Sequence, residues 1–219
     1  PRGVYQHKYE KMLYAYLGAR YCKLSARHPF TITFAVGGAG AQREIGEQIL
    51  RSLSPRMKRG EVRVFLVAGV RQDIYRYYQK VVDDLGLTAC EGECVRILYD
   101  SDKMRYFSLF NEALLSTDVL WTKPSELSFY IALGMPIIIA PPVGSQEDFN
   151  QSWILQHGAG FPQEDARYTS EWLFDWLSSG WLAEAAVSGF LHAPHQAVRH
   201  IESIVFDGVR SEIESIHLL

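Results

Sequence analysis

From residue 28 onward, short apolar segments alternate with longer amphipathic segments. The first apolar segment, "FTITFAV" (residues 30–36), is rich in β-branched and aromatic residues, which is typical of a buried strand. Further strands are expected at residues 62–69, 95–99, 118–122 and 136–142, and helices at residues 42–53, 73–86, 101–116, 125–134 and 147–158. This alternation predicts an α/β fold, namely a Rossmann-like, mostly parallel sheet with helices on both faces, plus N-terminal and C-terminal helices.

The length and composition fit one domain with an extension. The chain has 219 residues, of which 47% are hydrophobic, enough for a sizeable core. Residues 1–28 are expected to form a helical, locally basic N-terminal extension or linker, and residues 29–219 the Rossmann-like domain. The C-terminal part is expected to be mostly helical, with interruptions near Gly180 and Pro194, and the Trp-rich stretch 171–182 is expected to pack into the core.

Charge and hydropathy bear on the class of partner. The net charge of −3 gives no general case for nucleic acid, and no run approaches the roughly 18 apolar residues of a transmembrane helix. The N-terminal residues lack the apolar core of a signal peptide, so we expect a cytoplasmic protein. The basic residues of the N-terminal extension form either a solvated helix face or a contact with an anionic surface, such as a membrane or a missing domain.

The cysteines and histidines do not form a recognisable reactive or metal site. Three cysteines suit a reducing compartment, and the C-x₃-C spacing of Cys90 and Cys94 is not that of a redox motif, so we expect structural thiols. His192 and His195 are close in sequence, but Pro194 between them breaks helical facing, so no metal is expected. His157 is expected at a helix C-terminus, where the helix dipole favours it.

The most informative motif is a glycine-rich turn, "VGGAGA" (residues 36–41), between the first strand and its helix. Glycine permits positive φ there and removes the Cβ that would keep a ligand away. The following helix N-terminus presents unpaired N–H groups and favours an anion such as a diphosphate, although a tight turn without a ligand is the alternative. The dinucleotide motif G-x-G-x-x-G is absent, since Arg43 stands where its third glycine belongs, and no P-loop Gly-Lys-Ser/Thr follows. The expected phosphate-binding residues of this turn are Gly37, Gly38, Ala39, Gly40 and Gln42.

A second polar group of residues follows the strand expected at residues 118–122. Pro124 is preorganised for the first turn of a helix, and Ser125 is its expected N-cap. Lys123, beside this helix start, offers a second place for anionic oxygen. Glu126 either compensates the helix dipole or accepts hydrogen bonds from ribose or sugar hydroxyls.

A third polar group follows the strand expected at residues 136–142. Gln146 and Asn150 are placed to hydrogen-bond sugar hydroxyls, while capping of the next helix by Ser145 or Asp148 is the alternative. Open parallel sheets bind ligands beyond the carboxyl ends of their strands, so we expect the three groups of residues to meet at one edge.

The ordered set "FAVGGAGAQRE", "DVLWTKPSELSFYIALGMPIIIAPP" and "QEDFNQSWILQHGAG" resembles the C-terminal, donor-binding half of GT-B glycosyltransferases. The resemblance covers about residues 31–165 and is greatest to the peptidoglycan N-acetylglucosaminyltransferase family. It implies a UDP-type nucleotide-diphospho-sugar as substrate, no cofactor and a role at the cell envelope. It also implies that the glycine turn borders the diphosphate, that Ser125 approaches from the other side, and that Gln146 and Asn150 meet the sugar.

The chain departs from the family pattern in its residues and its length. The ribose-binding Glu of the family falls on Phe129, with Glu126 one turn earlier as a substitute. The family's D-x-Q-Q run is here "GSQE" (residues 144–147), which loses the Asp and one Gln. GT-B enzymes have two Rossmann-like domains, and the acceptor site and usual catalytic base lie in the one that this chain has no room for. No catalytic residue is therefore assigned.

Two hypotheses of different classes follow, with a third ranked below them. The first is the donor-binding half of an inverting, metal-independent glycosyltransferase, inactive as an isolated domain. Its acceptor domain would belong to the same chain or to a separate subunit. The second is a non-catalytic binding or scaffold module with this fold, and the third is a nucleotide-sugar epimerase, which needs further acid–base carboxylates. The nucleotide base, the sugar, the acceptor and the oligomeric state stay open.

Overall fold

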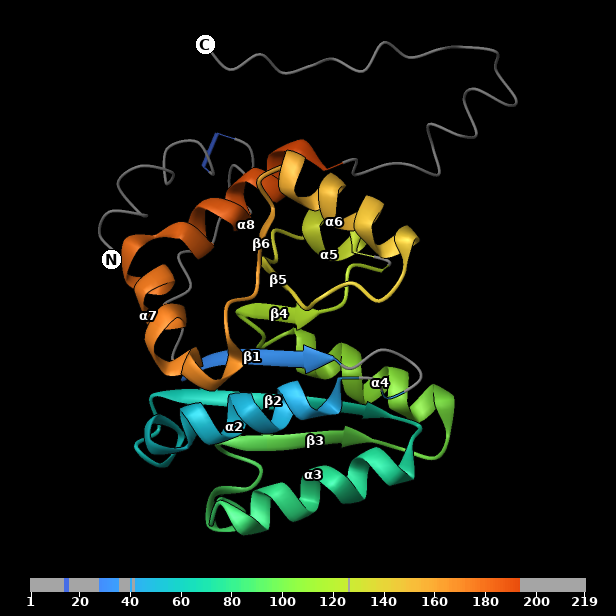
Figure 1. The fold of residues 1–219 in the computed structure, drawn as a ribbon, viewed down its shortest axis with the longest axis vertical. Helices are drawn as coiled ribbons and strands as arrows, with labels where there is room; N and C mark the ends of the chain where they lie inside the picture. The colour runs from blue at the N-terminus through green and yellow to red at the C-terminus, as the bar shows by residue number, and fades with distance from the viewer. Residues whose placement is uncertain (1–13, 16–27, 36–39, 41, 126, 194–219) are drawn as a thin grey trace.

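A computed structural model of the chain describes residues 14–15, 28–35, 40, 42–125 and 127–193. At its centre lies a six-stranded sheet in which every strand runs parallel to its neighbours, in the order β3-β2-β1-β4-β5-β6 (Figure 1). The strands are β1 (Phe30–Ala35), β2 (Val62–Gly69), β3 (Val95–Tyr99), β4 (Val119–Thr122), β5 (Ile137–Ile139) and β6 (Gly160–Pro162). The predicted Rossmann-like α/β fold is confirmed.

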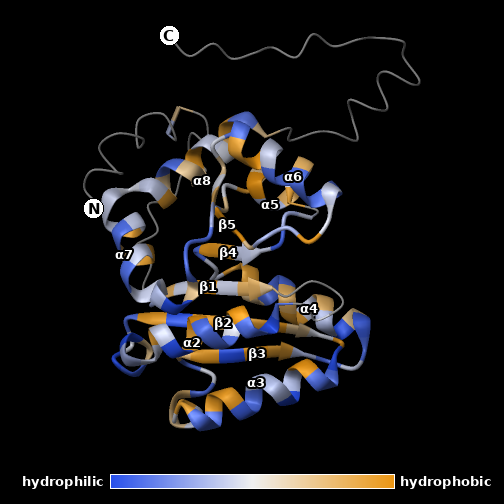
Figure 2. Cartoon of the chain, in the orientation of Figure 1, coloured by the Kyte–Doolittle hydropathy of each residue, from blue (hydrophilic) through white to orange (hydrophobic). Residues whose placement is uncertain are grey.

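Helices cover both faces of this sheet. They are α2 (Arg43–Lys58), α3 (Gln72–Asp84), α4 (Lys103–Leu114), α5 (Ser128–Ala132), α6 (Ser145–Gln156), α7 (Thr169–Ser179) and α8 (Trp181–His192), with short 3₁₀ turns η2 (Thr88–Cys90) and η3 (Ala166–Tyr168). In β2, Val64 and Leu66 pack with α2, α3 and α7, whereas the alternate residues Phe65 and Val67 pack with α4. The strands are accordingly coloured mainly as hydrophobic in Figure 2, as expected for a parallel sheet buried on both sides.

Helix α2 is longer than the sequence predicts, because it continues through Pro55 to Lys58. Leu53 and Met57 are both buried one turn apart, so continuing the helix places Met57 in the core. Proline removes one backbone hydrogen bond, and the hydroxyl of Ser54 donates instead to the carbonyl of Arg51 at 3.3 Å. Burial of the last turn outweighs the proline signal here.

The expected helix at residues 125–134 begins late, and Ser125 is not its N-cap. Helix α5 starts at Ser128 with Leu127 at the N-cap position and no side-chain cap. The amide of Ser125 donates to the carbonyl of Lys123 at 2.8 Å, and the amide of Leu127 to that of Ser125 at 3.0 Å. These two tight turns replace the first helical turn that Pro124 was expected to open.

The edge strand β6 was not predicted, and its glycine is required by close packing. A Cβ on Gly160 would lie 2.4 Å from the carbonyl oxygen of Ile137 in the neighbouring strand, so only glycine fits there. β6 has three residues and ends in Pro162, which is tolerated at a sheet edge. A strand this short gives no readable alternation of apolar residues.

The expectation of free structural thiols is wrong for Cys90 and Cys94. They form a disulfide whose Cα atoms are 5.4 Å apart. The 3₁₀ turn η2 and the positive φ of Gly92 (91°) fold the intervening residues back, so that the amide of Cys94 donates to the carbonyl of Cys90 at 2.8 Å. This pairing weakens the argument from these cysteines for a reducing compartment.

The C-terminal helices follow the expected pattern. Helices α7 and α8 meet at Gly180, whose φ of 87° is left-handed, while Pro194 lies outside the described residues. The prediction of core packing for the Trp-rich stretch is confirmed, since Leu173 and Trp176 are buried against the sheet. Of the expected N-terminal extension (residues 1–28), only residues 14–15 and 28 fall within the described part. None of the helices in the described part is sufficiently long and apolar to pass through a bilayer.

Candidate functional site

The loops that carry the candidate residues meet at the carboxyl edge of the sheet. Ala35 at the end of β1 is in register with Thr122 of β4, which is in register with Ile139 of β5. The chain segments that leave these three strands are therefore neighbours, on the side to which the arrowheads point in Figure 1. The expected convergence at one edge is confirmed for the described residues, while Gly37, Gly38, Ala39 and Glu126 lie outside them.

Within the part of the chain that the structure describes, the N-terminus of α2 has no side-chain cap. Gly40 and Gln42 both have φ near 70°, and Gln42, as N-cap, makes no capping hydrogen bond. The side chain of Gln42 turns instead to the loop after β5, where its Nε2 donates to the carbonyl of Pro141 at 2.8 Å. Among the described residues, no side chain accepts from the first-turn amides of this 16-residue helix, and the amide of Ile45 donates to the carbonyl of Gln42 at 3.0 Å. Amides at a helix start without side-chain acceptors suit an anion.

Sequence reasoning missed a cation near the glycine turn. A Cβ placed on Gly40 would lie 2.7 Å from Cδ1 of Ile74 and 3.9 Å from Nη2 of Arg71, so the start of α3 packs closely against this turn. Arg71 follows β2 and pairs with Asp73 at 2.8 Å, and this guanidinium lowers the pKa of the Asp73 carboxyl to about 2. The only signal for this cation in the sequence was a basic residue two positions after the end of the strand expected at residues 62–69.

Lys123 is held by an ion pair. Its Nζ donates to Oε1 of Glu147 at 2.9 Å, with only 12% of the Lys123 side chain exposed. The other carboxylate oxygen of Glu147 accepts from the amide of Val143 at 2.7 Å. Partial burial opposes ionisation of Glu147, but the hydrogen bonds from Lys123 and Val143 outweigh it, so its pKa is lowered. The charge expected to meet a ligand is therefore already partly neutralised.

Asn150 fixes the loop after β4 from the side of α6. Its Nδ2 donates to the carbonyls of Pro124 at 3.0 Å and Ser125 at 3.3 Å. The side-chain oxygen of Asn150 makes no hydrogen bond with the described residues and could accept one from a ligand hydroxyl. Together with Gln42–Pro141 and Lys123–Glu147, this contact cross-links the three loops before any ligand binds.

The remaining candidates lie at the solvent side of these loops. Gln146 is exposed in the first turn of α6, whose N-cap Gly144 provides no side-chain hydrogen bond. Phe129, at the position of the family's ribose-binding Glu, is 63% exposed on α5.

His157 is the C-cap of α6, as expected, and its Nδ1 contacts the carbonyl of Trp153 at 2.8 Å. No group of three or more potential metal-ligating side chains occurs among the residues that the structure describes.

The solved structures with a similar fold include three chains that are about twice as long as this one. MurG from Acinetobacter baumannii matches with a TM-score of 0.58 and 19% identity, over 84% of this chain and 50% of that one. WaaG, a glycosyltransferase of lipopolysaccharide biosynthesis, matches with a TM-score of 0.55 and 15% identity, over 96% and 51%. MnaA from S. aureus in complex with UDP matches with a TM-score of 0.52 and 9% identity, over 82% and 46%.

These matches show the fold alone. The chain has the fold of one half of a GT-B glycosyltransferase and spans about half the length of the structures it matches. A family model described as "Domain of unknown function (DUF6938)" matches residues 11–91, well under half of the chain. A comparison with curated proteins gives no match.

The Lys123–Glu147 pair yields a prediction on stability. At pH 7, Glu147→Gln should lower the free energy of unfolding by about 1–2 kcal/mol, because a mostly buried ammonium loses its ionic partner. The folded-state pKa of Glu147 is depressed, so the stabilisation is present above the ordinary value of 4.5 and lost as pH falls through the lowered value. In urea unfolding experiments, the free energies of unfolding of the wild type and the variant should therefore become more similar as the pH is lowered.

Glu112 provides the matched control for this variant. It is 63% exposed and lies 3.4 Å from Arg96, so Glu112→Gln should change the free energy of unfolding by less than about 0.5 kcal/mol. Equal effects of the two substitutions, or a Glu147→Gln effect that persists at acid pH, would contradict the assigned role.

Proposed function

We propose that this chain is the donor-binding half of a glycosyltransferase that uses a nucleotide-diphospho-sugar of the UDP type. The observation that carries the proposal is the uncapped N-terminus of α2, at Gly40 and Gln42, beside two cross-linked loops at the carboxyl edge of a parallel sheet. Ligands of open α/β sheets bind at this edge. Helix N-termini at the same place favour the negative charge of a diphosphate.

The arrangement can stabilise a departing nucleoside diphosphate without metal. As the bond between sugar and diphosphate breaks, negative charge develops on the phosphate oxygens, and fixed backbone N–H groups lower its energy. Arg71, which is paired with Asp73, lies near the turn. In this proposal Gln146 and Asn150 would hydrogen-bond the sugar. The transfer would follow an inverting, metal-independent course, and the acceptor's base would come from a second domain in the same chain or from a separate subunit.

Calorimetry with UDP, UMP and uridine tests the proposal. UDP should bind at least about tenfold more tightly than UMP, because the second phosphate gains charge-assisted hydrogen bonds from the helix N-terminus. Addition of EDTA should leave the affinity for UDP unchanged, and a UDP-sugar should bind without turnover by this chain alone. Absence of heat with any nucleoside diphosphate at millimolar concentration would contradict the proposal.

Phe129 favours a second candidate, a non-catalytic binding module with the same fold. A 63% exposed aromatic side chain stands where the resemblance expects a ribose-binding carboxylate. Such a module would associate with a protein partner without binding a nucleotide. The two candidates differ in the expected effect of a negative charge in the glycine turn, which would weaken nucleotide binding but leave association with a protein partner unchanged.

A further inference from the structure

Helix α4 packs on the sheet with one side and exposes large apolar side chains on the other. Its inner side, formed by Tyr106, Phe110 and Ala113, packs on β2 and β3. The side chains of its outer side follow one another at helical spacing and are all exposed: Met104, Phe107, Ser108, Asn111 and Leu115. The water-facing side of a helix is usually polar, so these apolar side chains indicate a contact surface.

The apolar surface continues from α4 onto the neighbouring helix α5 through a chain of aromatic rings. The ring of Tyr106 lies 5.5 Å from that of Phe107 and 6.1 Å from that of Phe110. Phe110 lies 6.3 Å from Tyr130 of α5, whose ring lies 5.5 Å from that of Phe129. We call the exposed apolar side chains of the two helices the α4–α5 surface: Met104, Phe107, Leu115, Phe129 and Leu133.

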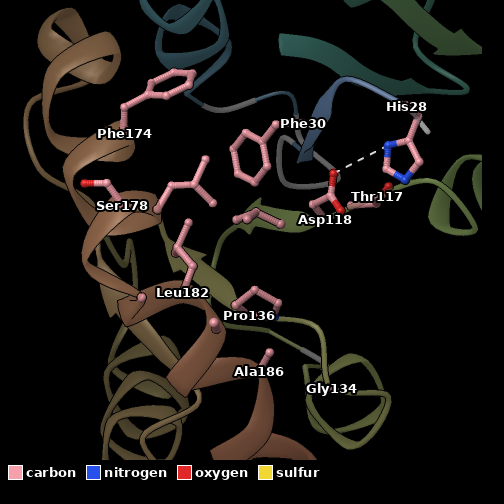
Figure 3. Close-up of a pocket in the computed structure, with 14 residues that line it drawn as sticks. His28, Phe30, Thr117, Asp118, Gly134, Pro136, Phe174, Ser178, Leu182 and Ala186 are labelled. Atoms are coloured by element: carbon pink, nitrogen blue, oxygen red, sulfur yellow. Dashed lines mark ion pairs between the residues drawn. The ribbon is translucent and has the colours of Figure 1, made fainter. Parts of the chain in front are cut away.

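The area of the α4–α5 surface fits an interface between proteins. With side-chain areas of about 150–250 Å² and exposed fractions between 42% and 88%, its five members expose on the order of 500 Å². An interface of standard size buries about 800 Å² on each partner, somewhat more than half of it apolar. None of the five lines the cavity of about 720 Å³ at the amino edge of the sheet, between Phe30 and helices α7 and α8 (Figure 3), so this surface is not the wall of that pocket.

The outer side of α4 is complementary to a second copy of itself that runs in the opposite direction. In such a pair, Met104 near the start of one helix lies against Leu115 at the end of the other, and both are apolar. Ser108 and Asn111, nearer the middle, meet each other across the pair, and a hydroxyl and an amide can hydrogen-bond. A twofold axis repeats each of these contacts.

The charges on one flank of α4 match in the same way. Arg105 and Glu112 are exposed and two helical turns apart, on the same side of the helix. Antiparallel packing therefore brings Arg105 of each copy close to Glu112 of the other. Glu112 also lies 3.4 Å from Arg96 of its own chain, but 63% of its side chain is exposed, which leaves it accessible to a second cation.

We propose that the α4–α5 surface binds a second copy of this chain in a twofold-symmetric dimer in which the two α4 helices pack antiparallel. The apolar side chains of the surface supply the driving force, and the Arg105–Glu112 contacts select the antiparallel direction. The proposal stands on the exposure and charge of α4 and α5, and it does not rest on nucleotide binding.

Sedimentation velocity of the full chain over a range of concentrations tests for the dimer. At about 200 μM the wild type should sediment mainly at twice the chain mass, because interfaces of this size give micromolar or tighter affinities. Leu115→Glu, at a position 88% exposed, places a carboxylate against Met104 of the other copy and should weaken the dimer at least about tenfold. Circular dichroism should show this variant folded.

Tyr168→Glu is the matched control. Tyr168 is an exposed aromatic residue of η3, which packs beside α2 on the other face of the sheet, so this variant should dimerise as the wild type does. A wild type that stays monomeric at about 200 μM, a Leu115→Glu variant that dimerises normally, or equal losses in the two variants would overturn the proposal. The affinity for UDP should be the same in both variants, so a failed dimer and a failed donor site are distinct results.

Charge reversal tests the antiparallel arrangement. Arg105→Glu and Glu112→Arg each place like charges opposite one another, so either variant alone should dimerise at least about tenfold more weakly than the wild type. An equimolar mixture of the two should form a heterodimer, because both contacts then join opposite charges, and the double variant should recover the wild-type dimer. A mixture that stays monomeric, or a double variant as weak as the single ones, would overturn the antiparallel pairing.

Discussion

Replacing Ala39 by Asp should weaken UDP binding by at least about a hundredfold. Ala39 lies between Gly38 and Gly40, in the turn that we propose borders the diphosphate. A carboxylate added there would repel a ligand that carries two or more negative charges, and at an effective dielectric constant near 20 such a contact costs about 3–4 kcal/mol. Calorimetry with UDP measures the effect directly.

Ala89→Asp is the matched control, because Ala89 is exposed in η2 and lies far along the chain from the candidate loops. It introduces the same charge and should leave the affinity for UDP within about twofold. Circular dichroism should show both variants folded. If Ala39→Asp binds UDP as the wild type does, the glycine turn is not the phosphate site; if neither protein binds UDP, the non-catalytic module becomes the better account.

Replacing Trp121 by Ala should lower the free energy of unfolding by about 3–5 kcal/mol. Trp121 of β4 is fully buried, with its ring edge-to-face against Phe34 at 6.0 Å and against Trp172 at 5.2 Å. Its indole Nε1 donates to Oε1 of Gln163 at 2.9 Å, which links β4 to the segment after β6. The substitution removes the packing and leaves a cavity beside the strand that precedes Lys123.

Trp181 provides the comparison within the same aromatic cluster. It stacks on Phe161 at 5.6 Å but is 49% exposed, so Trp181→Ala should cost only about 1 kcal/mol. Chemical denaturation of both variants measures the difference. Similar losses for the two tryptophans would mean that α7 and α8 do not pack on the sheet as described.

The fold could be predicted because its main strands carry a strong local signal. β2 and β3 were placed at their observed limits, since runs such as "VRVFLVAG" are too apolar and too β-branched for a surface helix. Glycine and Asp also mark helix ends here: Gly86 has a φ of 61° just after α3, and Asp102 caps α4 by accepting from the amide of Arg105. Each of these features depends on residues within one or two turns.

The errors arose where contacts distant in sequence decide the local structure. Pro55 predicted a helix end, but burial of Met57 extends α2 beyond it. β6 exists because Gly160 can approach Ile137, a contact that no local pattern reports. The disulfide between Cys90 and Cys94 depends on the turn at Gly92, which the C-x₃-C spacing does not specify.

The position of the candidate site could be predicted, but its internal contacts could not. The rule that parallel strands share a carboxyl edge places the loops together. The contact of Lys123 with Glu147, 24 residues away, and that of Gln42 with Pro141, 99 residues away, depend on how each loop bends. Side chains singled out as ligand groups thus have structural partners as well. The roles of Gln42, Lys123 and Asn150 toward a donor stay predictions.

A ¹⁵N–¹H NMR titration of the full chain with UDP tests the central claim most directly. The account predicts chemical-shift changes at the amides of Gly40, Gln42 and Ser125, at the carboxyl edge of the sheet, and none at His28 or Asp118, at the amino edge. Changes confined to the amino edge, or a spectrum that UDP leaves unaltered at millimolar concentration, would contradict it.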